Sequence, residues 1–230
     1  MKNYLTLLFL FTLFFPSFLS AQSGIDYNKL RLNSVNSREE IGTFDLREQI
    51  FIHQYFYNDE WMSAHILGNE YVEGKDLLVK YDILNQQLNV NIENVAMIAP
   101  NNVMSGFVFL GSNQKFICIE PKDWAKGKTF FEVIEKGEYS LLIHHSAIKQ
   151  KPNYNVALDT GSKSEKVIKK EAYYLMEMDK VFEIPRKKKA AEKFFSKYSH
   201  AKKYLKDNKV NFKKTEDLKK LVQYLNNEKK

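Results

Sequence analysis

The sequence predicts a mainly β, antiparallel body that is followed by a Lys-rich helical appendage at the C-terminus. Between residues 57 and 184, short apolar–polar alternations of period two are separated by turn residues. After residue 186, apolar residues recur every three or four positions, which is the period of a helix. Because no helical pattern lies between the strands, we expect an antiparallel meander, barrel-like or in two layers, and not a parallel α/β sheet.

Alternation identifies the individual strands. In Gln87–Glu93 the side chains of Leu88, Val90 and Ile92 share one face, and Leu77–Ile83 repeats the pattern one strand earlier. Turns are predicted at Glu73–Lys75, Gly111–Asn113 and Glu135–Gly137. The other strand candidates are Trp61–Leu67, Val95–Ile98, Ser105–Leu110, Lys115–Glu120, Thr129–Glu135, Tyr139–Lys149, Val167–Met178 and Lys180–Ile184. Gln49–Tyr57 fits either a strand or a helix, and Lys151–Lys166 is predicted to be a loop.

The first 21 residues have the order of a secretory signal peptide. Lys2 gives a positive start, Leu5–Leu19 is an apolar run, and Ser20–Ala21 supplies small residues for cleavage. The run contains Pro16 and is shorter than the roughly 20 residues that a membrane-spanning helix needs. We therefore predict export to the periplasm, the cell envelope or the medium, with the mature chain beginning at Gln22; an uncleaved anchor is the alternative.

Charge divides the chain at the same place as the periodicity. The whole chain has a net charge of +7, but Arg186–Lys230 holds sixteen Lys and Arg against five Asp and Glu, which leaves residues 22–185 acidic. The sequence thus predicts four parts: a signal peptide (1–21), a flexible lead-in with a short helix at Arg38–Gly42 (22–48), a β domain (49–185), and basic helices that pack on the β domain (186–230).

Two apolar stripes define the C-terminal helices. The first consists of Ala190, Phe194, Tyr198, Ala201 and Leu205. The second consists of Leu218, Leu221, Val222 and Leu225. Thr215 is the predicted N-cap of the second helix, with Glu216 and Asp217 in its first turn.

Several short motifs together resemble an uncharacterised family of exported, β-rich proteins of Bacteroidetes-type bacteria. The motifs are Tyr57–Trp61, Gly74 in a turn, Leu78–Ile83 with Leu88–Val90, Phe130–Ile134, Tyr139–Leu142 and Lys214–Asn226. The resemblance implies secretion and a β-rich fold, and it brings no established activity and no catalytic residues.

The histidines do not form a recognisable site. Phosphate-binding glycine loops, a Gly-x-Ser-x-Gly elbow and a His-Glu-x-x-His motif are all absent from the sequence. His144 and His145 are consecutive in a predicted strand, so they point to opposite faces and cannot easily chelate one ion. One of them could join His65 across the sheet. No metal, cofactor or catalytic residue is predicted.

The remaining reactive side chains are assigned structural roles. Asp159, Ser162 and Ser164 lie in a predicted loop, where turn formation accounts for them in the absence of an identifiable base. Cys118 is the only cysteine, which excludes an intramolecular disulfide, and it is expected to be a small buried hydrophobe.

The lysines of the appendage form a candidate anion-contacting face. They are Lys187, Lys188, Lys189, Lys202, Lys203 and Lys206. Three interpretations remain: a solvated outer face of docked helices, weak contact with an anionic envelope surface, or contact with an acidic protein surface. Nucleic acid is not expected as a partner, because Lys dominates over Arg and export removes the usual target.

The resulting functional hypothesis is an exported, non-enzymatic binding or interaction protein of the periplasm or cell envelope. The alternatives are a barrel-type carrier of a small apolar ligand and, third, an envelope hydrolase. A structure would distinguish these functions. A filled core favours the binding protein, an open apolar cavity favours the carrier, and a cleft that joins His to Asp or Ser favours the hydrolase.

Overall fold

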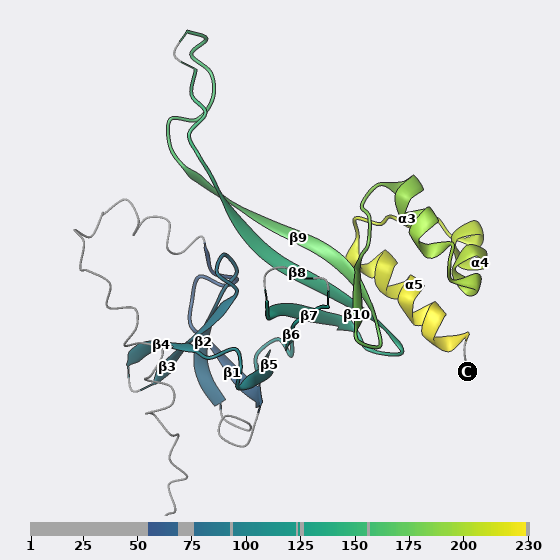
Figure 1. Ribbon diagram of the computed structural model, residues 1–230, viewed down its shortest axis with the longest axis horizontal. Helices are drawn as coiled ribbons and strands as arrows, with labels where there is room; N and C mark the ends of the chain where they lie inside the picture. The colour runs from purple at the N-terminus through teal and green to yellow at the C-terminus, as the bar shows by residue number, and fades with distance from the viewer. Residues whose placement is uncertain are drawn as a thin grey trace, which may run out of the picture.

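The computed structural model describes residues 55–68, 76–92, 94–122, 124, 127–155 and 157–228 (Figure 1). Ten strands form one antiparallel sheet: β1 (Met62–Gly68), β2 (Asp76–Asp82), β3 (Gln87–Ile92), β4 (Val95–Ala99), β5 (Met104–Phe109), β6 (Lys115–Ile119), β7 (Thr129–Glu135), β8 (Tyr139–Gln150), β9 (Lys166–Glu177) and β10 (Lys180–Glu183). The mainly β, antiparallel prediction is confirmed, and each predicted strand agrees with the structure to within one residue at either end.

The strand order departs from a simple meander at one place. Along the sheet the order is β10-β9-β8-β7-β6-β5-β1-β2-β3-β4. After β4 the chain returns to the free edge of β1, where β5 pairs with it, and the meander then continues from β5 to β10. The first strand therefore lies in the interior of the sheet.

The sheet curls so that β8 reaches the turn between β2 and β3. Asp82 shapes this turn by accepting the backbone N–H groups of Leu84 and Asn85, each at 2.9 Å. The Ala147 N–H then donates to the Ile83 carbonyl at 3.2 Å, which links β8 to the turn. This contact curls the N-terminal half of the sheet toward β8, while the sheet itself stays open, with β4 and β10 at its edges.

The Gln86 side chain reinforces that contact with four hydrogen bonds. Its amide nitrogen donates to the carbonyls of Ile83 and His145, each at 2.8 Å. Its amide oxygen accepts the hydroxyls of Tyr81 at 2.7 Å and Thr129 at 2.6 Å. One side chain therefore connects the β2–β3 turn to both β7 and β8.

The space inside the curl is filled by aromatic rings. Tyr81, Phe107, Phe109, Phe116 and Phe130 are all almost completely buried there. Phe107 and Phe116 stack with their ring centroids 4.7 Å apart, and Tyr81 packs edge-on against both. We call this cluster the aromatic core.

Three helices cover the other end of the same sheet, over β7, β8 and β9 (Figure 1). They are α3 (Lys188–Phe195), α4 (Ser199–Asp207) and α5 (Thr215–Asn227). As predicted, Leu218, Leu221, Val222 and Leu225 of α5 are buried, and with strand residues such as Leu141 they form what we call the helical core. The helices thus dock on the β body by their apolar faces.

Two details of the predicted helices are wrong. The first stripe is not continuous, because Ser196 ends α3: its N–H donates to Glu192 and Lys193, and its hydroxyl donates to the Lys193 carbonyl at 2.7 Å. Ala190 is exposed, and Ala191 and Phe195 face the helical core instead. The other four predicted residues do pack in the helical core: Phe194, Tyr198, Ala201 and Leu205.

Thr215 is not an N-cap. Lys214 occupies that position, and the Thr215 hydroxyl instead lies 2.9 Å from the Tyr173 hydroxyl on β9. A tertiary hydrogen bond has therefore replaced the predicted local one.

Beyond the aromatic core, β8 and β9 continue as a long hairpin that projects from the body (Figure 1). Its tip is the predicted loop between Gln150 and Lys166. The predicted signal peptide, the lead-in with its helix at Arg38–Gly42, most of Gln49–Tyr57 and the turn at Glu73–Lys75 lie outside the described residues. Among the described helices, none is long and apolar enough to cross a membrane.

Cys118→Ser should destabilise the protein by about 1–2 kcal/mol, because it places a hydroxyl among the apolar side chains of the aromatic core. The thiol is buried as expected, and burial raises its pKa to about 11. Denaturant unfolding measures the loss. Rapid modification of the native wild-type thiol by a disulfide reagent at pH 8 would contradict this placement.

Candidate functional site

A row of polar side chains crosses three strands between the two cores. Glu132 on β7, His145 on β8 and Glu171 on β9 lie on the sheet face that both cores share. On each strand the apolar residues two to four positions away belong to the cores: Phe130 and Ile134 on β7, Ala147 and Ile143 on β8, and Val167 and Tyr173 on β9. The polar row therefore marks the boundary at which the curled sheet stops and the helices begin.

His145 lies between two carboxylates. Its Nε2 is 2.7 Å from Glu132 Oε2, and its Nδ1 is 3.6 Å from Glu171 Oε1. The His145 and Glu132 side chains are only 7% and 10% exposed, whereas Glu171 is 55% exposed. The contact with Glu132 is within hydrogen-bond distance, whereas the contact with Glu171 is longer than a hydrogen bond.

The row continues through Gln114 to a tyrosine. The Gln114 amide nitrogen donates to Glu132 Oε1 at 3.1 Å and to the Tyr57 hydroxyl at 2.9 Å. Burial, followed by the charge of Glu132, raises the pKa of Tyr57 to about 12. The Tyr57 hydroxyl is therefore neutral at physiological pH and is a poor nucleophile.

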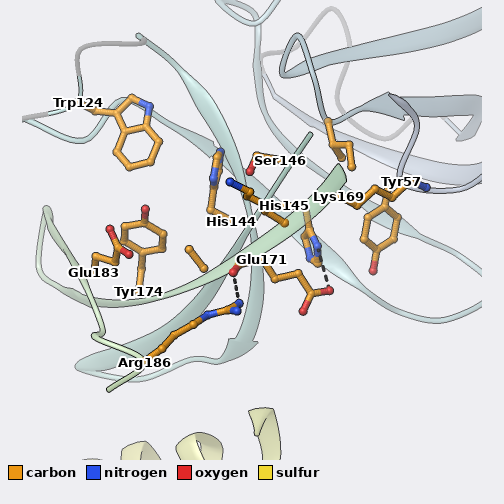
Figure 2. Close-up of a pocket in the computed structure, with 13 residues that line it drawn as sticks. Tyr57, Trp124, His144, His145, Ser146, Lys169, Glu171, Tyr174, Glu183 and Arg186 are labelled. Atoms are coloured by element: carbon orange, nitrogen blue, oxygen red, sulfur yellow. Dashed lines mark hydrogen bonds and ion pairs between the residues drawn. The ribbon is translucent and has the colours of Figure 1, made fainter. Parts of the chain in front are cut away.

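A cleft of about 1030 Å³ adjoins this row (Figure 2). Consecutive residues of β9, 169–172, line the cleft. Because neighbouring residues of a strand point to opposite faces, the cleft reaches both sides of β9. Lys169 and Glu171 line one half together with Tyr57 and His145. The other half is lined by Trp124, His144, Lys170, Ala172 and Tyr174.

Aromatic rings form the wall of the second half. Trp124 packs edge-on against His144 and Tyr174, with ring centroids 5.2 Å and 5.7 Å apart. The Thr129 hydroxyl donates to Gln86, so its oxygen can accept a hydrogen bond from His144 Nε2, 3.2 Å away. Burial, followed by the charge of Glu183, raises the pKa of Tyr174 to about 12.

The cleft follows an edge of the sheet. β10 pairs with β9 only as far as Tyr174, and the next backbone bond runs from the Ile184 N–H to the Tyr173 carbonyl at 2.8 Å. Beyond it, Arg186 donates from its guanidinium to the Glu171 carbonyl (Figure 2). By the alternation of an antiparallel ladder, the backbone groups of Lys169 and Val167 also point to this edge. No described strand pairs with them.

The structure separates the histidines that the sequence singled out. As predicted, His144 and His145 lie on opposite faces, one among aromatic rings and one between carboxylates. His65 does not join either of them: its Nδ1 lies 2.9 Å from Asp76 Oδ1, a partner on the neighbouring strand β2. Within the described ranges, no group of three His, Cys, Asp or Glu side chains is arranged to hold a metal ion.

The loop residues have the structural roles that the sequence suggested. Asp159 accepts the Tyr154 hydroxyl. The Ser162 hydroxyl donates to the Ser164 carbonyl at 2.9 Å. Both contacts stabilise the tip of the β8–β9 hairpin, away from the polar row.

The candidate lysines of the appendage are all exposed: Lys187, Lys188, Lys189, Lys202, Lys203 and Lys206. They come from two elements, because the first three lie at the start of α3 and the others on α4. Only Lys188 has an acidic partner among the described residues, Glu192, at 3.8 Å.

Sequence reasoning missed Glu132, Glu171 and Arg186. A signal for Glu132 was present, because it places a charge between Phe130 and Ile134 on an otherwise apolar strand face. Glu171 gave no such signal, because Lys169 shares its face of β9. Pairing them with His145 required the register of β7, β8 and β9, which no local pattern contains.

Comparisons of the chain with models of protein families, with curated proteins and with solved structures gave no match. The resemblance to exported proteins of Bacteroidetes-type bacteria therefore remains a prediction from the sequence, and the argument about function rests on the site itself.

Stability should fall as the pH rises from about 9 to 12. The pKa values of Cys118, Tyr57 and Tyr174 are raised in the folded protein, so the unfolded chain loses these protons first and becomes favoured. The stabilisation is complete below the unfolded-state pKa values and is lost as the pH rises through the folded-state values. Tyr57→Phe removes one titrating group and should make the decline shallower. Urea unfolding at several pH values measures the unfolding free energy of both proteins. If it declined with pH equally steeply in the wild type and in Tyr57→Phe, the role assigned to the Tyr57 proton would be contradicted.

Proposed function

We propose that this protein is an exported, non-enzymatic binding protein of the periplasm or cell envelope, and that it binds an extended acidic segment of a partner protein. The binding site is the cleft that wraps around the open edge of β9. The observation that carries this proposal is the position of cationic side chains, Lys169, Lys170 and Arg186, along an edge of β9 with which no described strand pairs; the Lys169 ammonium also donates to the Phe56 carbonyl at 2.6 Å.

The filled aromatic core argues against a barrel that carries a small apolar ligand. The rings of Phe107, Phe116 and Phe130 occupy the interior that such a ligand would need. The hollow that adjoins the core opens instead at the edge of the sheet, between the aromatic and helical cores. A ligand in this position contacts backbone and charged side chains.

The chemistry of the cleft favours binding over hydrolysis. His145 has a carboxylate partner at each ring nitrogen, so neither nitrogen faces a hydroxyl or thiol that it could activate. Ser146 follows His145 on the strand and therefore points to the other face of the sheet. The Tyr57 hydroxyl keeps its proton at physiological pH.

An open strand edge offers backbone hydrogen bonds to a partner strand, and the flanking charges decide which strand is accepted. Lysines on an edge strand discourage pairing between copies of the same chain and with neutral strands. An acidic strand gains from the same lysines. The Arg186 guanidinium already donates to the Glu171 carbonyl, in the place where a partner strand would begin.

A synthetic strand tests this function. The probe is an acetylated, amidated heptapeptide that alternates glutamate with valine, titrated into the ¹⁵N-labelled mature protein. Amide signals of residues 166–172 should shift, and binding should weaken with salt because exposed charges are screened within about 8 Å at 0.15 M. A peptide with lysine in place of glutamate should not bind.

Two substitutions at one position separate charge from strand pairing. Lys169→Gln should weaken peptide binding about threefold by removing one charge. Lys169→Pro also removes an outward N–H group, which an edge strand tolerates, and should abolish binding. Equal affinity of the wild type and both variants, or signal shifts remote from β9, would contradict the proposal.

Export has its own test. N-terminal sequencing of the protein from envelope fractions of the expressing cells should give a chain that begins at Gln22, because Ala21 is the last small residue of the cleavage region. An intact Met1 in the cytoplasmic fraction would contradict both the localisation and the choice of an envelope partner.

A further inference from the structure

A second hollow lies between the chain that enters α3 and the chain that enters α5. This groove of about 860 Å³ is lined by the cations Arg186, Lys187, Lys188 and Lys213 and by the apolar side chains of Val210 and Phe212. It is distinct from the cleft around β9, although Arg186 borders both. We call it the basic groove.

The charge of the basic groove is poorly compensated. No acidic residue lines it. Among the described residues, Arg186, Lys187 and Lys213 form no ion pair, and Lys188 has one distant partner, Glu192, at 3.8 Å with both side chains exposed. Like charges that are held together repel one another, so a bound anion would stabilise this part of the fold.

The segment that forms one wall of the groove is held in place by the structure. The Asn211 N–H donates to Asp217 of α5 at 2.8 Å. The Phe212 ring is 3% exposed and stacks on Phe195 of α3 with centroids 6.0 Å apart. The Lys213 carbonyl accepts the Tyr173 hydroxyl of β9 at 3.5 Å. The groove is therefore fixed by contacts with two helices and the sheet.

We propose that the basic groove binds the phosphate group of an amphiphile. Lys187, Lys188 and Lys213 supply three cations, which suit a phosphate, whose several oxygens accept charge-assisted hydrogen bonds from different directions. The half-buried Val210 side chain provides an apolar wall beside these cations, against which the first carbons of an acyl chain pack. This inference does not rest on the function proposed for the β9 cleft.

The probe is dihexanoyl phosphatidylglycerol, which is soluble as a monomer and so presents the headgroup without the general field of a membrane. Glycerol phosphate and hexanoate each supply one half of its chemistry. Titration of the ¹⁵N-labelled protein should shift the amides of residues 187–188 and 210–213. The phospholipid should bind more tightly than glycerol phosphate, and hexanoate should bind most weakly.

Two triple variants with the same change in charge form a matched pair. Lys187→Gln/Lys188→Gln/Lys213→Gln alters the groove but leaves Arg186, and hence the β9 cleft, unchanged. Lys202→Gln/Lys203→Gln/Lys206→Gln removes three exposed lysines of α4 that do not line the groove. The groove variant should weaken phospholipid binding at least about tenfold, and the α4 variant should change it by less than about twofold.

Three results would overturn the proposal. Equal losses in the two variants would mean that a diffuse basic surface attracts the lipid. Hexanoate that binds as tightly as the phospholipid would exclude the role of the phosphate, and glycerol phosphate that does so would exclude the apolar wall. Because neither variant alters Lys169 or Lys170, acidic-peptide binding in the same samples reports on the β9 cleft independently.

Discussion

The fold depends on the way in which a single large sheet is bent back on itself. The Gln86 side chain, in the turn between β2 and β3, bonds to that turn and to both β7 and β8. Sheets with many strands twist and curl, and a curled sheet encloses an interior on its concave face. Here the curl brings Ile83 to Ala147 and places the aromatic rings of β2, β5, β6 and β7 together.

The curl is also the reason why a cleft exists. β8 and β9 are each 12 residues long. One end of their shared face packs in the aromatic core and the other end packs in the helical core. Neither core covers the strip between them, and that strip is polar: Glu132, His145 and Glu171. His145 and Glu171 of this row line the cleft, and Glu132 bonds to His145 Nε2 at 2.7 Å.

The appendage extends this arrangement. The helices bury their apolar stripes on the sheet and direct their lysines outward, as the sequence led us to expect. The lysines are not equivalent, however. Those beside Arg186 border a groove with an apolar wall, whereas those of α4 do not. The tertiary contacts of Phe212 and Tyr173 create this difference.

Local sequence patterns were sufficient to predict where the strands lie in the chain, but not the order in which they pair in the sheet. Alternation such as that of Leu88, Val90 and Ile92 helped to locate the strands that the structure describes, because it reflects burial on one face of a sheet. The insertion of β1 between β2 and β5 depends on pairing between distant residues, as does the contact of His145 with Glu132. The break at Ser196 was missed because the spacing of apolar residues continues across it while the backbone does not.

The unfolding free energy of Gln86→Ala tests the curl most directly. The substitution leaves the buried hydroxyls of Tyr81 and Thr129 and two carbonyls without their partner, so we predict a loss of about 3 kcal/mol in urea unfolding. Gln150→Ala, at an exposed glutamine on β8, is the matched control and should change the free energy by less than about 0.5 kcal/mol. Equal, small effects of the two substitutions would contradict the view that Gln86 holds the curled sheet together.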